Sequence, residues 1–398
     1  MSHSAALDGI RVLDLSRFIS GPFCGMQLGD LGAEVVKVER LGVGEDCRPV
    51  APHINGESLY IMVHNRNKRG LAIDYRAAGA TAVLKRLCAN VDILIENFRP
   101  GTMEAMGLDW ETLHAINPRL IMVRISGFGQ DGPTSRRPCF DVIAQAASGL
   151  MNMTGQADGP PTMAGTFIID YSTGLYATIA ALAALEARHR SGRGQMVQAS
   201  LLTSAMSLLM TAIPEYLLFG KNTTRQGTRD RYATPANNFR CSDGVWVHIS
   251  SGNDTLFGRF ARATDLRDML DDPRFATSDQ RMANIDAVEA RVAEWAARHT
   301  NGEVLAILSS AQVPCAKIAD IADVVADEQV QHLGQIIEID HPVAGKVPMQ
   351  GFPIGLSETP TSVRRAAPTI GQHTDAVLAE WGGFTQLEIG ELRSARVI

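Results

Sequence analysis

Residues 10–39 read IRVLDLSRFISGPFCGMQLGDLGAEVVKVE. The apolar run Ile10–Leu15 predicts a buried strand, and the similar run Ala33–Glu39 predicts a second one. Between them, Ser20–Pro22 is typical of a helix start because proline fits the first turn of a helix, and Gly32 marks the helix end. Strand, helix and strand joined by short turns favour a parallel sheet covered by helices.

The same alternation continues along the chain. Further strands are predicted in GLAIDY, VDILIENF, LIMVRISGFG and QMVQASLL, which begin at Gly70, Val91, Leu120 and Gln195. Helices are predicted over Arg76–Ala89, from Asp109 to Ile116, and over Phe140–Met151, Ser172–Arg190 and Thr203–Phe219, the last one kinked or broken at Pro214. These elements extend one parallel-sheet domain to about residue 205.

The character of the sequence changes near Gly220. The segment NNFRCSDGVWVHISSG, Asn237–Gly252, predicts a hairpin with its turn at Ser242–Gly244, and charged amphipathic helices follow at Asn284–His299 and Gly302–Ala311. We therefore expect an α/β protein of two domains. The expected Rossmann-like large domain covers residues 1–205 and 335–398, a smaller α/β domain covers residues 225–325, and residues 206–224 and 326–334 link them.

Charge and cysteine usage argue against several classes of protein. The net charge of −6 gives no reason to expect a nucleic acid or an anionic membrane as a partner. The N-terminal MSHSAALDG lacks the basic and apolar regions of a signal peptide, and the apolar run Leu175–Leu185 meets charged residues before it could span a bilayer. Six scattered cysteines form no CxxC pair, and no HExxH motif occurs, so we expect a cytoplasmic protein with reduced thiols, no metal site and no permanently bound cofactor.

The nucleotide-binding motifs of common α/β enzymes are missing. The turn after the first strand reads SRFISGP rather than GxGxxG, which argues against an NAD enzyme, and neither GxxxxGK[ST] nor GxSxG occurs. Arg40 and Arg99 follow predicted strands, and Lys68–Arg69 and Arg76 surround another one. Because ligands of parallel sheets bind at the carboxyl ends of the strands, these residues together suit an anionic ligand, although each alone is more typical of a solvated surface position.

One acid stands in unusual surroundings. In GTFIIDYSTGLYATIAALAAL, residues 165–185, Asp170 lies between the apolar run Phe167–Ile169 and a long, almost uncharged run. An unpaired buried charge costs several kcal/mol, or the group takes up a proton instead. Asp170 therefore either caps a helix that begins near Ser172 or has chemistry to perform.

Whole phrases of the sequence resemble the class III CoA-transferases from about Leu7 to the C-terminus. They include LGDLGAEVVKVE, NRNKRGLAIDY, ENFRPGTMEAMGLDWETL, NPRLIMVRISGFGQDGP, FDVIAQAASGLMNMTG and GQHTDAVL. The resemblance implies an enzyme that transfers coenzyme A reversibly from an acetyl-, succinyl- or formyl-CoA type of thioester to a carboxylic acid. It also implies an interlocked homodimer whose active site lies between the large domain of one subunit and the small domain of the other.

In this family the nucleophile is an aspartate that follows a DGPP-like turn, and the matching residue is Asp170. Its carboxylate would attack the thioester to give a mixed anhydride and CoA thiolate, and the thiolate would then form an aspartyl-CoA thioester. The acceptor acid would reverse these steps. Each step exchanges acyl bonds of similar energy, so neither ATP nor a metal is needed, but water must be excluded.

The resemblance further implies the residues that contact coenzyme A. They are Phe18, Ile19, Ser20, Arg40, Ile73, Arg76, Asn97, Phe98, Arg99, Phe140 and Asp141. One position departs from the family, because formyl-CoA transferase has an arginine where this chain has Ala105. Arg99 is a candidate to replace that phosphate contact.

The acceptor is less well defined by the sequence. The four-glycine loop of formyl-CoA transferase is absent, and the matching region His248–Gly258 offers Ser251, Gly252 and Asn253 for a shorter lid. GNDTLF and ENFRPGTME resemble members that use acetyl-CoA with oxalate or succinyl-CoA with glutarate, so we expect a small dicarboxylate acceptor. Arg17 is a candidate for its distal carboxylate, and a structural role for Arg17 is equally compatible with the sequence.

Two alternatives remain. A racemase of the same family removes a proton with a histidine before the acid at Asp141 and a glutamate in the hairpin, where this chain has Phe140 and Arg240. Neither of these side chains acts as a base at neutral pH. Asp170 does not discriminate, because the racemase also has an aspartate at that position. A non-catalytic acyl-CoA binder is the other alternative, and it would keep the basic loops without needing Asp170.

Overall fold

The computed structural model describes residues 5–398, which form two compact units. The described part of the first unit comprises residues 5–150, 164–213 and 331–398, and the second comprises Met151–Met163 and Pro214–Val330. Met151–Met163 groups with the second unit, although it lies within the predicted large domain.

A six-stranded sheet forms the centre of the first unit, and every neighbouring pair of its strands is parallel. The strands, in spatial order, are β5 (Lys68–Ile73), β2 (Glu34–Arg40), β1 (Arg11–Asp14), β6 (Ile93–Glu96), β7 (Ile121–Ser126) and β8 (Met196–Ser200). This arrangement confirms the predicted α/β fold with a parallel sheet. The strand order reverses between β1 and β6, and a ligand of such a sheet binds outside the carboxyl ends of the strands at this reversal.

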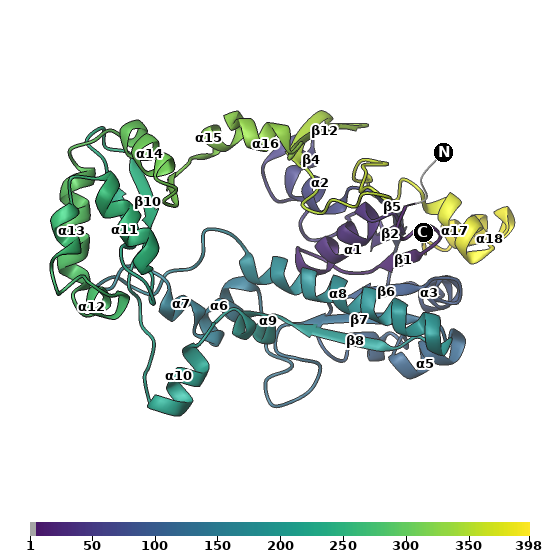
Figure 1. The fold of residues 1–398 in the computed structure, drawn as a ribbon. Helices are drawn as coiled ribbons and strands as arrows, with labels where there is room; N and C mark the ends of the chain where they lie inside the picture. Colours follow the sequence, from purple (N-terminus) through teal and green to yellow (C-terminus); the bar gives the residue numbers. More distant parts are fainter. Residues whose placement is uncertain (1–4) are drawn as a thin grey trace. The chain divides into compact units, whose positions relative to one another are not determined.

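Helices cover both faces of the sheet (Figure 1). Side chains alternate between the faces along each strand, so Leu13 and Val36 enter one core while Val12 and Val35 enter the other. The first face carries α3 (Ala80–Cys88), α5 (Trp110–Ile116) and α17 (Thr374–Gly382); the second carries α1 (Ser20–Asp30), α6 (Asp141–Ser148), α8 (Ile168–Ser191) and α9 (Leu201–Ser207).

The remaining elements of this unit are short. They are β3 (His53–Ile54), β4 (Glu57–Ser58), α2 (Leu59–Asn65), α4 (Thr102–Ala105), β12 (Ile336–His341), β13 (Gly345–Gln350) and α18 (Gln386–Ser394). The C-terminal segment returns to the sheet, where α17 packs on β5 and α3 and buries Trp381.

Two predicted helices need correction. Helix α8 begins at Ile168 rather than Ser172, which places Asp170 in its first turn. The predicted helix Thr203–Phe219 is two helices, α9 and α10 (Ala212–Phe219), and the break lies before Pro214, which sits in the first turn of α10 where proline is tolerated.

Helix α8 has the length and hydropathy of a membrane-spanning helix, and so does the bent pair α9 and α10 taken together. Half of the most apolar 18-residue window of α8 is buried in the protein. It lies against β7 and β8 of the sheet, as a helix that covers one face of an α/β sheet does.

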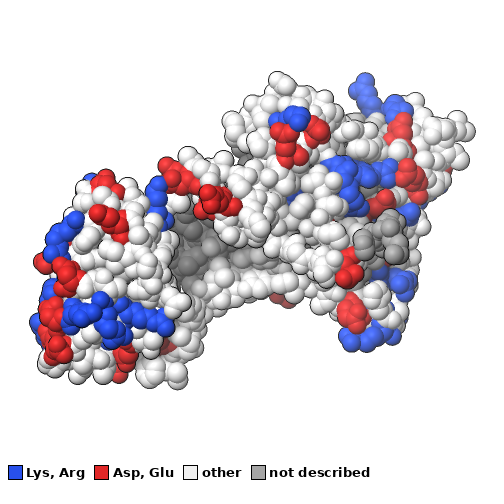
Figure 2. All heavy atoms as spheres, turned by 45° about the horizontal axis from the view of Figure 1, so that its top comes forward, with Lys and Arg blue, Asp and Glu red and all other residues white. Residues whose placement is uncertain are grey.

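The second unit has its own antiparallel sheet of β9 (Ala236–Arg240), β10 (Trp246–Ser250) and β11 (Cys315–Lys317), and β9–β10 is the predicted hairpin. Its helices are α11 (Asp254–Ala263), α12 (Ser278–Ala283), α13 (Ile285–Ala296), α14 (Asn301–Ser310), α15 (Ile321–Ala326) and α16 (Glu328–His332), with a 3-10 helix at Arg267–Leu270, while α7 (Leu150–Met153) and α10 begin at the boundary between the units. Figure 2 shows basic and acidic side chains next to one another on this unit, as in the exposed pair Arg291–Asp268.

Gly174 allows α1 and α8 to touch. A Cβ atom at Gly174 would lie 2.7 Å from the carbonyl oxygen of Ser20 and 2.9 Å from Phe23 Cδ1. Because Gly174 lies one turn after Asp170 on the same side of α8, this contact also brings Ser20 next to Asp170.

We therefore expect Gly174→Ala to lower the free energy of unfolding by about 1–3 kcal/mol, and with it the melting temperature, because the backbone of α1 must shift. Gly390→Ala is the matched control, because it places the same methyl group in α18 with no atom within 4 Å. There alanine should be neutral or stabilising. Thermal unfolding measures both, and equal melting temperatures for the two variants would contradict the close contact.

Candidate active site

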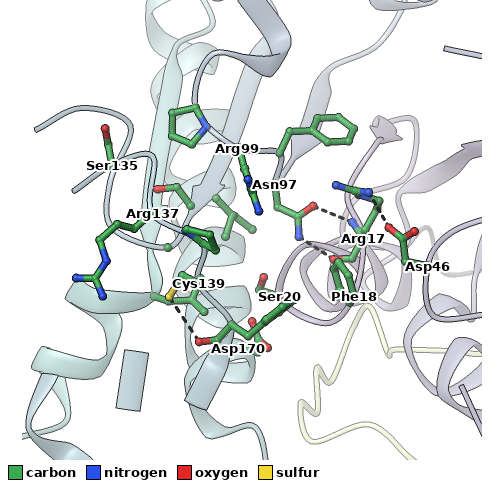
Figure 3. A pocket seen from close by; sticks show the side chains of 18 residues that line it. Arg17, Phe18, Ser20, Asp46, Asn97, Arg99, Ser135, Arg137, Cys139 and Asp170 are labelled. Atoms are coloured by element: carbon green, nitrogen blue, oxygen red, sulfur yellow. Dashed lines mark hydrogen bonds and ion pairs between the residues drawn. The ribbon is translucent and has the colours of Figure 1, made fainter. Parts of the chain in front are cut away.

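A pocket lies at the carboxyl ends of β1, β6 and β7, where the strand order reverses (Figure 3). The loops after β1, β2, β6 and β7 supply its walls, together with the end of β7, the first turn of α8 and the start of α9. The lining residues are Arg17, Phe18, Ser20, Asp46, Asn97, Phe98, Arg99, Pro100, Ile125, Ser126, Gly127, Ser135, Arg137, Pro138, Cys139, Phe140, Asp170 and Leu201. All of them belong to the first unit.

Asp170 lies at one end of this pocket, close to Ser20 and Cys139 in Figure 3. Its side chain is mostly buried, with 8% of the residue exposed. It does not cap its own helix, because the free amides of Ile169 and Asp170 donate to Asp141 Oδ2 at 2.7 and 3.0 Å. The carboxylate of Asp170 is therefore left available to a ligand.

Asp141 is held in place by its own helix. It begins α6, is 1% exposed, and accepts a hydrogen bond from Gln145 Nε2 on its other oxygen. Gln145 Oε1 in turn accepts from the amide of Ala164, which lies just before α8. Asp141 thus positions the start of α8.

Burial raises the pKa of Asp170 to about 7, and the negative charge of Asp141 adds to this effect. A hydrogen bond from Ser20 acts in the opposite direction and lowers the pKa. At neutral pH Asp170 therefore exists in both protonation states. Burial, with a contribution from Asp170, raises the pKa of the neighbouring Cys139 thiol to about 11, so Cys139 is not a competing thiolate.

The loop after β1 is fixed to the loop after β6. The amide of Arg17 donates to Asn97 Oδ1 at 2.8 Å, and Asn97 Nδ2 donates back to the carbonyl oxygen of Arg17 at 2.7 Å. The ring of Phe18 meets the ring of Phe140 edge-on, with centroids 5.2 Å apart. This clamp and the two rings give the pocket a rigid, partly apolar wall.

Positive charge comes from three arginines of the lining. Arg17 pairs with Asp46 at 2.6 Å, and Asp46 also pairs with Arg40 at 2.6 Å. Arg99 and Arg137 form no ion pair with any residue in 5–398, and Arg137 lies over the ring of Phe128 at 5.2 Å. Two unpaired guanidinium groups suit the phosphates of an anionic ligand.

The structure brings most of the predicted site residues of the first unit together. Eight of them line the pocket, namely Arg17, Phe18, Ser20, Asn97, Phe98, Arg99, Phe140 and Asp170. Ile19, Ile73 and Asp141 have buried side chains, so any contact of Ile19 or Ile73 with a ligand must come from the backbone. Arg40 reaches the pocket through Asp46, and Arg76 is exposed outside the lining.

The predicted lid residues belong to the second unit, between β10 and α11. Ser251 is fully buried, the carbonyl oxygen of Gly252 accepts from Arg281 Nη2 at 2.7 Å, and Asn253 Oδ1 caps α11 by accepting from the amide of Leu256 at 2.8 Å. Each of them has a structural role in this unit, and their role toward an acceptor stays a prediction. Arg240 of β9 is exposed in the same unit.

Ten of the lining residues were not among the predicted site residues, and three of these ten have ionisable side chains, namely Asp46, Arg137 and Cys139. The basic pair Arg136–Arg137 shortly before Phe140 was a usable signal, because it follows a predicted strand as Arg40 and Arg99 do. Among residues 5–398 no group of three or more His, Cys, Asp or Glu side chains is placed to hold a metal ion.

The raised pKa of Asp170 predicts a pH-dependent cost to stability. Since its folded-state pKa of about 7 exceeds the ordinary value of 3.8, the cost is absent below the lower value and grows as the pH rises to the higher one. Asp170→Asn should therefore stabilise the protein by on the order of 1–4 kcal/mol near about pH 8 and not near about pH 4. Melting temperatures at both pH values measure this, with the exposed Asp131→Asn as a control that should change neither.

The chain is similar to known proteins over most of its length. The model of CoA-transferase family III matches residues 7–374. A succinyl-CoA–D-citramalate CoA-transferase of Chloroflexus aurantiacus is 38% identical over 393 residues, or 98% of each chain. Human succinyl-CoA:glutarate CoA-transferase is 35% identical over 399 residues, which is 100% of this chain and 91% of that protein. A crystal structure of a CAIB/BAIF family protein from Brucella suis superposes with a TM-score of 0.84 at 35% identity, over 95% of this chain and 100% of that one.

Proposed function

The chain belongs to CoA-transferase family III, and from this premise we propose that it transfers coenzyme A from an acyl-CoA, foremost succinyl-CoA, to a small dicarboxylate by covalent catalysis at Asp170. That the protein is a CoA-transferase follows from full-length relatives at 35–38% identity. The relatives named for citramalate, glutarate and malate support a dicarboxylate acceptor.

One observation carries the mechanism, the free carboxylate of Asp170 in a pocket with two unpaired arginines. Because Asp141 satisfies the amides of α8, Asp170 can attack the thioester carbonyl. The carbon–sulfur bond breaks, CoA leaves as a thiolate, and a mixed anhydride forms on Asp170. The thiolate attacks the aspartyl carbonyl and releases the first acid. The acceptor carboxylate then attacks this enzyme thioester, which forms a second mixed anhydride and releases CoA thiolate again. The thiolate attacks the acceptor carbonyl of this anhydride, which gives the new acyl-CoA and frees the carboxylate of Asp170.

Burial serves this scheme in two ways. An anhydride survives only where water is excluded, and Asp170 has little exposure and lines the same pocket as Phe18 and Phe140. A raised pKa also makes the ionised carboxylate a stronger nucleophile, and a pKa of about 7 keeps a large share ionised at neutral pH.

The ligand's charges can be assigned to the arginines. Arg99 and Arg137 would hold the phosphates of coenzyme A, which supports the replacement expected for the arginine missing at Ala105. Arg17, held on one side by Asp46, is the candidate for the distal carboxylate of the acyl group or acceptor.

We also propose a homodimer. Apolar side chains stay exposed on α8 and around α9, among them Leu175, Tyr176, Ile179, Met206 and Leu208. Ile179 is 60% exposed, which is unusual for a helix that also covers a sheet. The second copy of the chain is the partner that the family resemblance implies, and a cytoplasmic location stays a prediction from the free cysteines.

A CoA-transfer screen tests the proposed function. Acetyl-, succinyl- and formyl-CoA are each combined with oxalate, glutarate, malate and related acids, and the products are followed by mass spectrometry. We expect the highest rates with succinyl-CoA and a dicarboxylate, and an adduct on Asp170 after hydroxylamine or borohydride trapping. Asp170→Asn should lower the rate by about 10³-fold or more. Full turnover by this variant would exclude the covalent scheme, and exchange of the alpha hydrogen without CoA transfer would favour a racemase.

The arginine assignment makes a separate prediction. Arg99→Gln and Arg137→Gln should each raise the KM for the acyl-CoA by about 10-fold with little change in kcat, because a phosphate contact is the same in ground and transition states. Arg136→Gln is the matched control, since Arg136 neighbours Arg137 but does not line the pocket. Steady-state kinetics decide the matter, and equal KM values for all three variants would refute the assignment.

A further inference from the structure

Beneath the pocket lies a cluster of buried charges that the proposed reaction does not use. On the face of the sheet that α1 and α8 cover, β1 and β2 begin with Val12 and Val35 but continue toward their carboxyl ends with Asp14 and Lys37. Asp14 and Lys37 are register partners, and they are 0% and 1% exposed. Buried charges are costly unless each has a partner, so the partners of these charges show what the cluster holds together.

Most of the cluster ties secondary-structure elements together. Lys68 at the start of β5 donates to Asp14 Oδ2 at 2.8 Å, to the carbonyl oxygen of Pro22 at 2.7 Å and to Asn65 Oδ1 at 2.9 Å. These three bonds use all three protons of the ammonium group. Nearby, Arg48 pairs with Glu39 at 2.7 Å.

Lys37 differs, because its partners lie on two loops of the pocket. Its ammonium group donates to the carbonyl oxygen of Ser16 and pairs with Glu45 Oε2 at 2.5 Å. Ser16 directly precedes Arg17 in the loop after β1, and Glu45 directly precedes Asp46 in the loop after β2. One buried cation therefore holds both loops.

The loop after β1 needs such support. Phe18 has a φ of 67°, a conformation that is unfavourable for a residue with a large side chain. The amide of Ser16 donates to Asp14 Oδ1 at 2.9 Å, and a Cβ atom at Gly21 would lie 2.2 Å from Ser16 Cβ. The loop is thus fixed at Ser16 by Asp14 and Lys37. At its other end, Ser20 lies beside the carboxylate of Asp170.

We infer that Lys37 is a positioning residue of the active site: its hydrogen bond to the carbonyl oxygen of Ser16 holds the loop Ser16–Ser20 so that Ser20 meets Asp170, and its ion pair with Glu45 places Asp46 against Arg17. The inference deepens the proposed function and rests on it, since it assumes that Asp170 is the nucleophile. Stability alone does not account for the pair, because well-packed apolar residues often replace a buried ion pair without loss.

The ionisation of Asp170 reports on the position of Ser20. Burial and the charge of Asp141 raise the pKa of Asp170, and the hydrogen bond from Ser20 lowers it. Cys139, Tyr60 and Tyr171 also lie within electrostatic reach, and their own raised pKa values keep them neutral. Of the lining arginines, Arg99 and Arg137 lie on loops with which Lys37 forms no hydrogen bond or ion pair, and Arg17 lies on the loop that Lys37 holds. If Ser20 withdraws, the pKa of Asp170 must rise.

The test uses the full-length double variant Lys37→Met, Glu45→Met, which removes both charges and leaves none unpaired. We expect a melting temperature close to that of the unchanged protein and a kcat that falls about 10–100-fold, because the nucleophile loses its alignment. We also expect the acid limb of the kcat/KM profile to move upward by about half a pH unit or more. Titration of ¹³C-labelled aspartate by NMR, with Asp170 assigned from its absence in Asp170→Asn, measures the same shift without turnover.

Arg188→Met is the matched control, because it removes another buried cation, from the far end of α8, where Arg188 pairs with Asp92 at 2.8 Å. It should lower the melting temperature but leave the acid limb and the Asp170 titration in place. An unchanged Asp170 titration and kcat in the folded double variant would overturn the inference. If the double variant does not fold, Glu45→Gln decides, with a smaller shift in the same direction expected and no shift counting against the inference. A protein that never transfers CoA, yet whose Asp170 titration shifts, would refute the proposed function and leave the positioning role standing.

Discussion

The two hydrogen bonds from the start of α8 to Asp141 are the contacts on which the site depends. A helix that begins in a protein interior must satisfy its first amides, and an aspartate in the first turn commonly does so itself. Here Asp141 accepts the amides of Ile169 and Asp170, so the carboxylate of Asp170 faces the pocket instead. The same arrangement places a second negative charge near Asp170, which helps to raise its pKa. The position of Asp141 therefore explains both why the carboxylate of Asp170 is free to react and part of the rise in its pKa.

The parallel sheet decides where this carboxylate meets its ligand. The loops after β1 and β6 diverge at the reversal of strand order, and the reciprocal bonds between Arg17 and Asn97 hold them at a fixed separation. Charged residues replace apolar ones at the carboxyl ends of β1 and β2. The buried side chain of Lys37 therefore bonds to residues of two loops instead of only packing in the core. The site combines a wall of aromatic rings with the guanidinium groups of Arg99 and Arg137, which form no ion pair within the described residues 5–398.

The sequence predicted the parts that short-range patterns encode. Apolar runs and turn residues were sufficient for the parallel sheet and the β9–β10 hairpin, and the isolated acid among apolar residues was sufficient to single out Asp170. It did not predict that α8 begins at Ile168, because the residue that caps it lies 28 positions away in sequence. The capping role of Asp141 arises from a tertiary contact and leaves no local pattern. The basic pair Arg136–Arg137 does leave one, but it does not show which of the two arginines lines the pocket. The family resemblance supplied the other positions, and it could not distinguish side chains that face the pocket from those, such as Ile73, that face the core.

The return of the C-terminal segment has a consequence for biosynthesis. Helix α17 covers β5 and buries Trp381, and Val397 and Ile398 also enter the core that contains Leu71 and Ile73. While the ribosome translates residues 214–330, the six strands and the helices α3 and α5 have been made, but α17 has not. The part of this face at β5 therefore stays uncovered until α17 is made, and such exposed apolar surface on a nascent chain is a binding site for chaperones.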